Sequence, residues 1–198
     1  MAPRWKLLTM LIIAMVIVGC ILIFGPRSWF PSFYMPTFMG IVALIFALLL
    51  VLPEWIFIPK NKRQRKAREH LQITLALCLI LSGAGELGLW QLYLIGFQYD
   101  KLVHILITGL LTFSFSHFAQ EWWGFSFKRA LTATAFLVFA LGIIWEVIEF
   151  YSDRIFGTQL FGVYGTQISR DTIIDLISNL IGIGLAILIR QRVKFHAD

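Results

Sequence analysis

Long apolar segments dominate the chain, and short polar segments separate them. Six segments are apolar over roughly the 20 residues that an α-helix needs to cross a bilayer. They cover residues 7–24, 37–58, 71–96, 102–119, 130–150 and 172–190. Each run is continuous and does not alternate between apolar and polar residues as a strand would. The pattern predicts an all-α, polytopic membrane helical bundle with about six transmembrane helices.

Composition supports a membrane protein. Hydrophobic residues make up 59% of the 198 residues and charged residues 14%, whereas soluble domains have about 45–50% and about 25%. The longest polar stretches, 25–36, 59–70 and 151–171, are each too short to bury a core of their own. We therefore expect a single integral membrane domain over residues 1–198.

Basic residues are unequally shared between the two sides that six spans create. One side collects thirteen of the 17 Lys and Arg residues, including the run KNKRQRKAREH at 60–70, and the other side collects four. Cytoplasmic loops of membrane proteins carry an excess of Lys and Arg. The asymmetry predicts that both termini are cytoplasmic. It also indicates that the basic run is a cytoplasmic loop and not a nucleic-acid-binding arm, and contact with anionic lipid headgroups is compatible with this interpretation.

Most of the eleven acidic residues fall in the outer half of the last four segments or just beyond them. They are Glu86, Asp100, Glu146, Glu149, Asp153, Asp171 and Asp175. The three acids of the fifth segment are spaced so that they spread over only about 60° around the helix axis. Positions 171, 175 and 179 of the sixth segment spread over about 80°. Ionisable residues within a membrane normally face the bundle interior or a water-filled cavity. We expect an outward-facing polar site there.

Carboxylates combined with one histidine form a suitable ligand set for a divalent cation such as Mg, Mn or Zn. The expected ligands are His104, Glu146, Glu149, Asp175 and Asp100. A bound cation would relieve the repulsion between acids at this spacing. Without a metal, the same acids are candidates for a proton relay.

Four residues at the rim of this site are candidates for acting on a substrate. We expect Asp171 or Asp153 to be a general base, and Arg170 and Lys101 to hold negative charge on the substrate. Glu86 and Asn179 would complete the polar core. An equally good interpretation of the acids at 100, 153 and 171 is that they are solvated residues at helix ends. The acid at position 171 would then cap the sixth helix.

Small residues and a glycine-rich loop make up the remaining motifs. GAGELG at 83–88 and GIG at 182–184 lie within apolar segments, where small residues favour close helix packing. The segment 157–167 is glycine-rich and follows the acids of the fifth segment. It is either a lid over the site or an ordinary loop.

Three stretches carry a resemblance to a known family: YDKLVH at 99–104, WEVIEFYSDRIFGTQ at 145–159 and DTIIDLISNLIG at 171–182. They resemble the bacterial YjdF-type inner-membrane family of unknown function, and more loosely the VanZ-like proteins. The resemblance covers about residues 80–190. It implies a multi-pass protein of the bacterial inner membrane with a role in the cell envelope. It also implies that the polar residues shared by the family correspond to the acids of the last three segments, Lys101, His104 and Asn179. VanZ-like proteins usually have Gln where this chain has Glu149.

Three functions follow as hypotheses. The first is a metal-dependent hydrolase or transferase that acts on a lipid or a lipid-linked envelope substrate. The second is a transporter for protons, cations or a small solute. The cytoplasmic halves of the segments look almost purely apolar, and no internal repeat is evident, which argues against transport. The third is a non-catalytic envelope or partner protein with a paired polar core.

Overall fold

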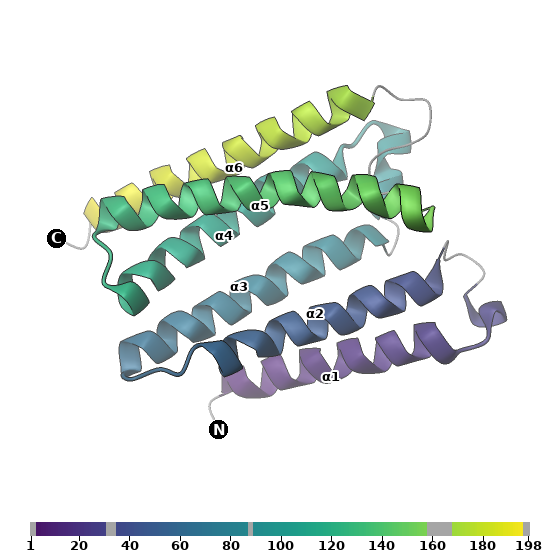
Figure 1. Cartoon of the computed structure of the whole chain (residues 1–198), viewed down its shortest axis with the longest axis horizontal. Helices are drawn as coiled ribbons and strands as arrows, with labels where there is room; N and C mark the ends of the chain where they lie inside the picture. Colours follow the sequence, from purple (N-terminus) through teal and green to yellow (C-terminus); the bar gives the residue numbers. More distant parts are fainter. Residues whose placement is uncertain (1–2, 31–34, 87–88, 158–167, 196–198) are drawn as a thin grey trace. The chain divides into compact units, whose positions relative to one another are not determined.

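All regular secondary structure is helical wherever the computed structural model describes the chain, which is over residues 3–30, 35–86, 89–157 and 168–195. The α-helices are α1 (Pro3–Phe24), α2 (Pro36–Ile56), α3 (Lys62–Glu86), α4 (Tyr99–Trp123), α5 (Phe127–Phe156) and α6 (Ile168–Phe195). Two 3-10 helices, η1 (Arg27–Trp29) and η2 (Leu89–Ile95), lie between them. The predicted all-α polytopic fold is confirmed (Figure 1).

Five helices are long and apolar enough to cross a membrane: α1, α2, α4, α5 and α6. The exception is α3, whose first turns carry the basic run. The third predicted segment, 71–96, is not one continuous helix, because α3 ends at Glu86 and a 3-10 helix follows. Gly83 and Gly85 precede this end, and glycine disfavours helix continuation. The helical part of the predicted segment extends only about 24 Å, short of the ~30 Å hydrocarbon core.

The chain forms two compact units, Met1–Ile80 and Leu81–Asp198. In the first unit, α1 and α2 pack along each other. Side chains of α3 bind the end of α2. Arg68 donates a hydrogen bond to the Phe57 carbonyl at 3.0 Å and pairs with Glu54 at 2.9 Å, and Gln72 donates to the Leu50 carbonyl at 3.1 Å. These bonds supply polar partners where α2 terminates.

The second unit is a bundle in which α4, α5 and α6 pack on one another. A short connection turns α4 back into α5. Gly124 ends α4 at φ 65°, a left-handed conformation that glycine adopts without strain, and the Ser126 side chain accepts the Arg129 backbone N–H at the start of α5. Helix α5 is therefore antiparallel to α4, and α6 returns parallel to α4 (Figure 1). The starts of α4 and α6 and the end of α5 consequently meet at one end of the bundle.

Two glycines allow α6 to approach its neighbours closely. A Cβ at Gly182 would overlap the Ile105 carbonyl oxygen and the Thr108 hydroxyl of α4. A Cβ at Gly142 of α5 would lie 2.6 Å from Asn179 Nδ2. The predicted packing role is confirmed for Gly182, whereas in the described part of the chain a Cβ at Gly184 would meet nothing within 4 Å.

Candidate metal centre

The bundle end just described gathers most of the predicted polar residues. Helix α4 contributes Asp100, Lys101 and His104 from its first two turns, and α5 contributes Glu146. Helix α6 contributes Asp171, Asp175 and Asn179. Four of these seven are buried: His104, Glu146, Asp175 and Asn179. These seven residues are far apart in the sequence. They meet at one end of the bundle because α5 runs antiparallel to α4 and α6 runs parallel to α4.

Lys101 is the centre of an ion-pair cluster. Its Nζ lies 2.9 Å from Asp100 Oδ2, 2.6 Å from Asp171 Oδ1 and 2.6 Å from Asp175 Oδ1. The side chain is only 13% exposed, so these pairs are partly shielded from solvent. An ammonium group has three donors, and all three are used by aspartates from α4 and α6. The cluster therefore ties the starts of the two helices together.

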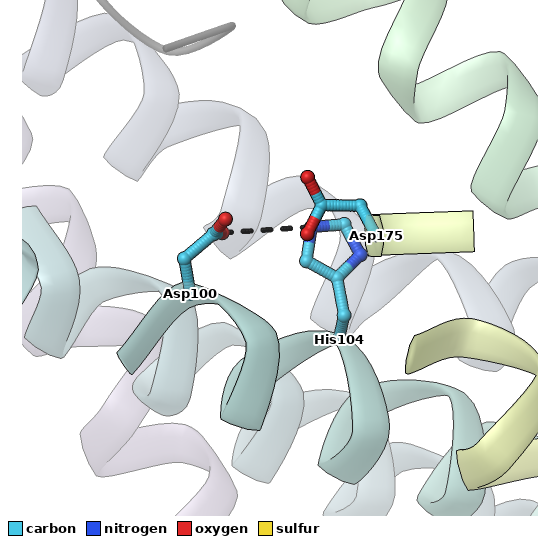
Figure 2. Close-up of side chains that lie close together, drawn as sticks. All are labelled: Asp100, His104 and Asp175. Carbon is cyan, nitrogen blue, oxygen red and sulfur yellow. Dashed lines mark ion pairs between the residues drawn. The ribbon is translucent and has the colours of Figure 1, made fainter. Parts of the chain in front are cut away.

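His104 lies beside this cluster with its Nε2 facing three carboxylates. Asp100 Oδ1 is 3.5 Å away, Asp175 Oδ1 3.7 Å and Glu146 Oε1 4.0 Å. Figure 2 shows the carboxylates of Asp100 and Asp175 turned toward the imidazole ring. The ring is buried, so its nearest polar neighbours decide which nitrogen carries hydrogen.

Asn179 sets the orientation of that ring from the other side. The His104 Nδ1 lies 3.1 Å from Asn179 Oδ1, and an amide oxygen can only accept. The Nδ1 therefore carries hydrogen, and in the neutral ring the Nε2 lone pair faces the acids. Asn179 is itself fully buried, and its backbone carbonyl accepts the Thr108 hydroxyl at 3.2 Å. A histidine held in this way has the tautomer of a metal ligand.

One buried carboxylate oxygen beside His104 lacks a hydrogen-bonding partner. Glu146 Oε1 accepts no hydrogen bond from the residues that the structure describes. Asp175 differs, because both of its oxygens lie within 2.8 Å of Lys101 Nζ. Buried polar groups normally have a partner, and an orphaned one calls for an ion or water. The orphaned Glu146 oxygen lies 4.0 Å from His104 Nε2.

The charges in the cluster do not balance. Four acids, Asp100, Glu146, Asp171 and Asp175, face one lysine and one histidine. With a neutral histidine and ionised acids, the net charge is −3, and with a protonated histidine it is −2. Like charges at these separations disfavour joint ionisation. A divalent cation or additional protons would reduce this imbalance.

The donor set fits a divalent cation. Asp100, His104 and Asp175 offer one ligand atom each, and these atoms lie within 4.8 Å of one another. Two ligands bonded to one ion at about 2.1 Å lie roughly 3–4.2 Å apart, the range of the three contacts of His104. Glu146 offers its orphaned oxygen to the same region. Imidazole with carboxylates suits Mn²⁺ or Zn²⁺, and Mg²⁺ prefers the carboxylates alone.

Three predicted residues lie elsewhere on α5 and α6, and a fourth is not described. Glu149 of α5 accepts a hydrogen bond from Trp145 Nε1 at 2.7 Å. Asp153 lies two turns beyond Glu146, and Arg170 is exposed in the first turn of α6. The Glu86 side chain is outside the described residues, and so is most of the glycine-rich segment 157–167. Glu149 is thus partly buried and bonded to an indole, and it lacks the ion-pair distance to His104 that Glu146 has.

Buried polar residues also continue along α4, which the sequence interpretation missed. Thr108, Thr112 and Ser116 are buried, and Gln120 accepts a hydrogen bond from Arg190 of α6. The halves of the helices away from the acid cluster, expected to be cytoplasmic, are therefore not purely apolar. The signal in the sequence was the recurrence of polar residues every four positions after His104, the spacing that keeps side chains on neighbouring turns.

Comparison with known proteins agrees with this picture at the level of the whole chain. No curated protein and no solved structure matches it. The similarity to VanZ-like proteins accordingly stays a prediction, whereas the resemblance to a membrane-protein family of unknown function is confirmed. One family model matches residues 4–194, which includes every helix that contributes to the polar cluster. The chain belongs to the family described as "Predicted membrane protein (DUF2238)".

Proposed function

We propose that this membrane protein is a metal-dependent hydrolase or transferase that acts on a lipid or lipid-linked substrate of the bacterial inner membrane. The observation that carries the proposal is the gathering of Asp100, Asp175 and the orphaned, buried Glu146 Oε1 around His104 Nε2. A cation would be held by these groups. It would polarise a phosphoryl or acyl oxygen and lower the pKa of a bound water.

The residues around the cation site suit the remaining tasks of such a reaction. Lys101 currently donates to three aspartates, and a cation that engages Asp100 and Asp175 would leave donors of Lys101 for an anionic substrate oxygen. Asp171 has a side chain that is 34% exposed and lies at the rim, where a general base could reach water. Asn179 would keep the imidazole in the ligand tautomer throughout.

The accessibility of the cluster favours catalysis over a purely structural metal. Structural sites are closed by protein ligands, whereas catalytic sites keep a position open for water or substrate. Asp100 has a side chain that is 38% exposed, so the cluster is accessible from its own end of the bundle. Because the substrate would come from the membrane, a site at the end of three apolar helices lies at a suitable depth.

A matched pair of variants tests the cation site. Glu146→Gln removes a proposed ligand, whereas Glu149→Gln makes the same chemical change three residues along α5 and keeps an acceptor for Trp145. Purified proteins are stripped with EDTA, dialysed against Mn²⁺, Mg²⁺ or Zn²⁺, and analysed for bound metal. We expect about one ion per chain in the wild type and in Glu149→Gln, and at least tenfold weaker binding in Glu146→Gln. Absence of bound metal in the wild type at micromolar concentration would refute the site.

A second assay addresses the reaction. Wild type and His104→Ala are incubated with a bacterial polar lipid extract, with and without the cation, and the lipids are followed by mass spectrometry. Loss of a phosphate-bearing or acylated lipid only with wild type and cation would support the enzyme. Metal binding without any lipid change would leave the cation site standing and refute the catalytic part.

A proton or cation transporter is the second candidate, and the buried hydroxyls of α4 favour it. Thr112 is fully buried, and its Oγ1 has no hydrogen-bonding partner among the described residues. Such a group between the acid cluster and Gln120 could contact water or an ion. Proteoliposomes loaded with a pH-sensitive or metal-sensitive dye would show flux abolished by Thr112→Val if this is the function.

A further inference from the structure

The opposite end of the α4–α6 bundle carries a half-buried guanidinium group. Arg190 lies in the membrane-spanning part of α6, and its Nη2 donates a hydrogen bond to Gln120 Oε1 of α4. The guanidinium carbon lies 5.3 Å from the centre of the Phe113 ring and 5.6 Å from that of Phe127. Three helices thus hold the group in place, with two aromatic rings beside it.

Arg190 lacks the acidic partner that a charge at this depth normally has. No carboxylate of the residues that the structure describes lies within the 4.0 Å of an ion pair with its guanidinium. Its Nε is buried and makes no hydrogen bond within the same part of the chain. Intramembrane charges are rare, are almost always paired, and mark functional sites by default. The guanidinium is therefore positioned for an anionic group that the described residues do not supply.

The surroundings of Arg190 are basic and aromatic. Lys128 and Arg129 begin α5 next to Phe127, and Arg192 lies two residues beyond Arg190 on α6. All three are exposed. The Arg129 guanidinium lies 4.2 Å from the centre of the Phe125 ring. A positive surplus at a helix end beside aromatic rings is the arrangement that attracts anionic lipid headgroups.

We propose that Arg190 binds the phosphate of an anionic phospholipid headgroup at this end of the bundle. A guanidinium can donate two parallel hydrogen bonds to phosphate, and the bond to Gln120 uses only Nη2 of Arg190. Lys128 and Arg129 would add charge attraction from the start of α5. The site lies about 30 Å along α4 from Asp100, so the inference does not depend on the cation site.

The test compares two arginines of the same helix. Wild type, Arg190→Gln and Arg192→Gln are purified in a mild detergent, mixed with equal amounts of phosphatidylglycerol and phosphatidylcholine, and analysed by native mass spectrometry. We expect the wild type and Arg192→Gln to retain phosphatidylglycerol in preference to phosphatidylcholine by at least tenfold. Arg190→Gln should lose that preference. Equal loss in both variants, or no preference in the wild type, would overturn the proposal.

A second variant keeps the test decisive if Arg190→Gln does not fold. Gln120→Glu gives Arg190 a carboxylate partner within the protein, so the guanidinium is satisfied internally and the fold is retained. Phosphatidylglycerol retention should then fall as in Arg190→Gln, and unchanged retention would contradict the assigned site. A parallel arm adds 10 mM inorganic phosphate. If free phosphate displaces the lipid completely, the site recognises phosphate as such and not a lipid headgroup.

Discussion

Individual side chains decide which of the many acids in this chain share a site. Glu146 and Glu149 differ by less than one helical turn, yet Glu146 is buried near His104 and Glu149 accepts a hydrogen bond from Trp145. His104 is likewise defined by a neighbour, because Asn179 determines which ring nitrogen faces the carboxylates. At this scale, the chemistry depends on contacts between helices and not on the type of residue alone.

Asn179→Ala is expected to weaken cation binding about 10- to 100-fold, the range found when a partner of a metal-bound histidine is removed. The physical reason is that the His104 ring loses the acceptor that holds hydrogen on Nδ1. Calorimetric titration with Mn²⁺ measures the change. Ser178→Ala, the adjacent buried residue of α6, serves as control and should bind as the wild type does. Unchanged affinity in Asn179→Ala would show that the imidazole is not a ligand.

At the scale of the elements, close helix approach and helix direction position the site. Helix α6 contacts both α4 and α5, and glycines lie where its backbone or side chains come nearest. The parallel course of α4 and α6 puts Lys101 beside Asp171 and Asp175 at one end and Gln120 beside Arg190 at the other. The polar ends and the small residues between them thus belong to one interface.

Gly142→Ala is expected to lower the free energy of unfolding by about 1–3 kcal/mol, the usual effect of overpacking. Its Cβ would lie 2.6 Å from Asn179 Nδ2, so α5 or the Asn179 side chain must move. Gly184→Ala is the matched control, because among the described residues its Cβ would meet nothing within 4 Å. Thermal unfolding in detergent compares the two. A Gly142→Ala protein as stable as the control would contradict the close approach of α5 and α6.

For the whole molecule, the membrane topology depends on whether the third predicted segment crosses. Five helices meet the length and composition of a span, and α3 does not. The shares of thirteen and four basic residues, however, favour a topology in which α3 with η2 crosses as a sixth element, since otherwise the basic start of α5 and end of α6 would face outward. We therefore expect both termini in the cytoplasm and the acid cluster on the outer side.

A fluorescent reporter that matures only in the cytoplasm tests this topology. Fused after Asp198, it should fluoresce, and fused to a chain truncated after Gly157, it should remain dark. Equal expression of both fusions is checked by immunoblot. The reverse pattern would mean that α3 does not cross and that the acid cluster faces the cytoplasm.

Binding of the cation should also stabilise the whole molecule. A ligand present at about 100 times its Kd and bound only by the folded state adds about 2.7 kcal/mol. We expect Mn²⁺ to raise the unfolding temperature of the EDTA-stripped wild type and of EDTA-stripped Glu149→Gln. The unfolding temperature of Glu146→Gln should not rise. A rise of equal size in Glu146→Gln would place the ion elsewhere.

The sequence by itself determined the helical membrane fold, most helix positions and the end of the bundle that is rich in acids. These features are local. The length of an apolar segment, its capping residues and the unequal distribution of basic residues between loops can be seen without knowing which helices touch. Only the tertiary structure decided that α3 ends at Glu86, that Lys101 joins three aspartates and that Glu146 rather than Glu149 faces His104. It also showed that Arg190 contacts Gln120 and no carboxylate of the described chain. The physical reason is that rotation and depth of packed helices are set by close contacts such as those at Gly142 and Gly182. Spacing along one helix does not specify which neighbour a given face will meet.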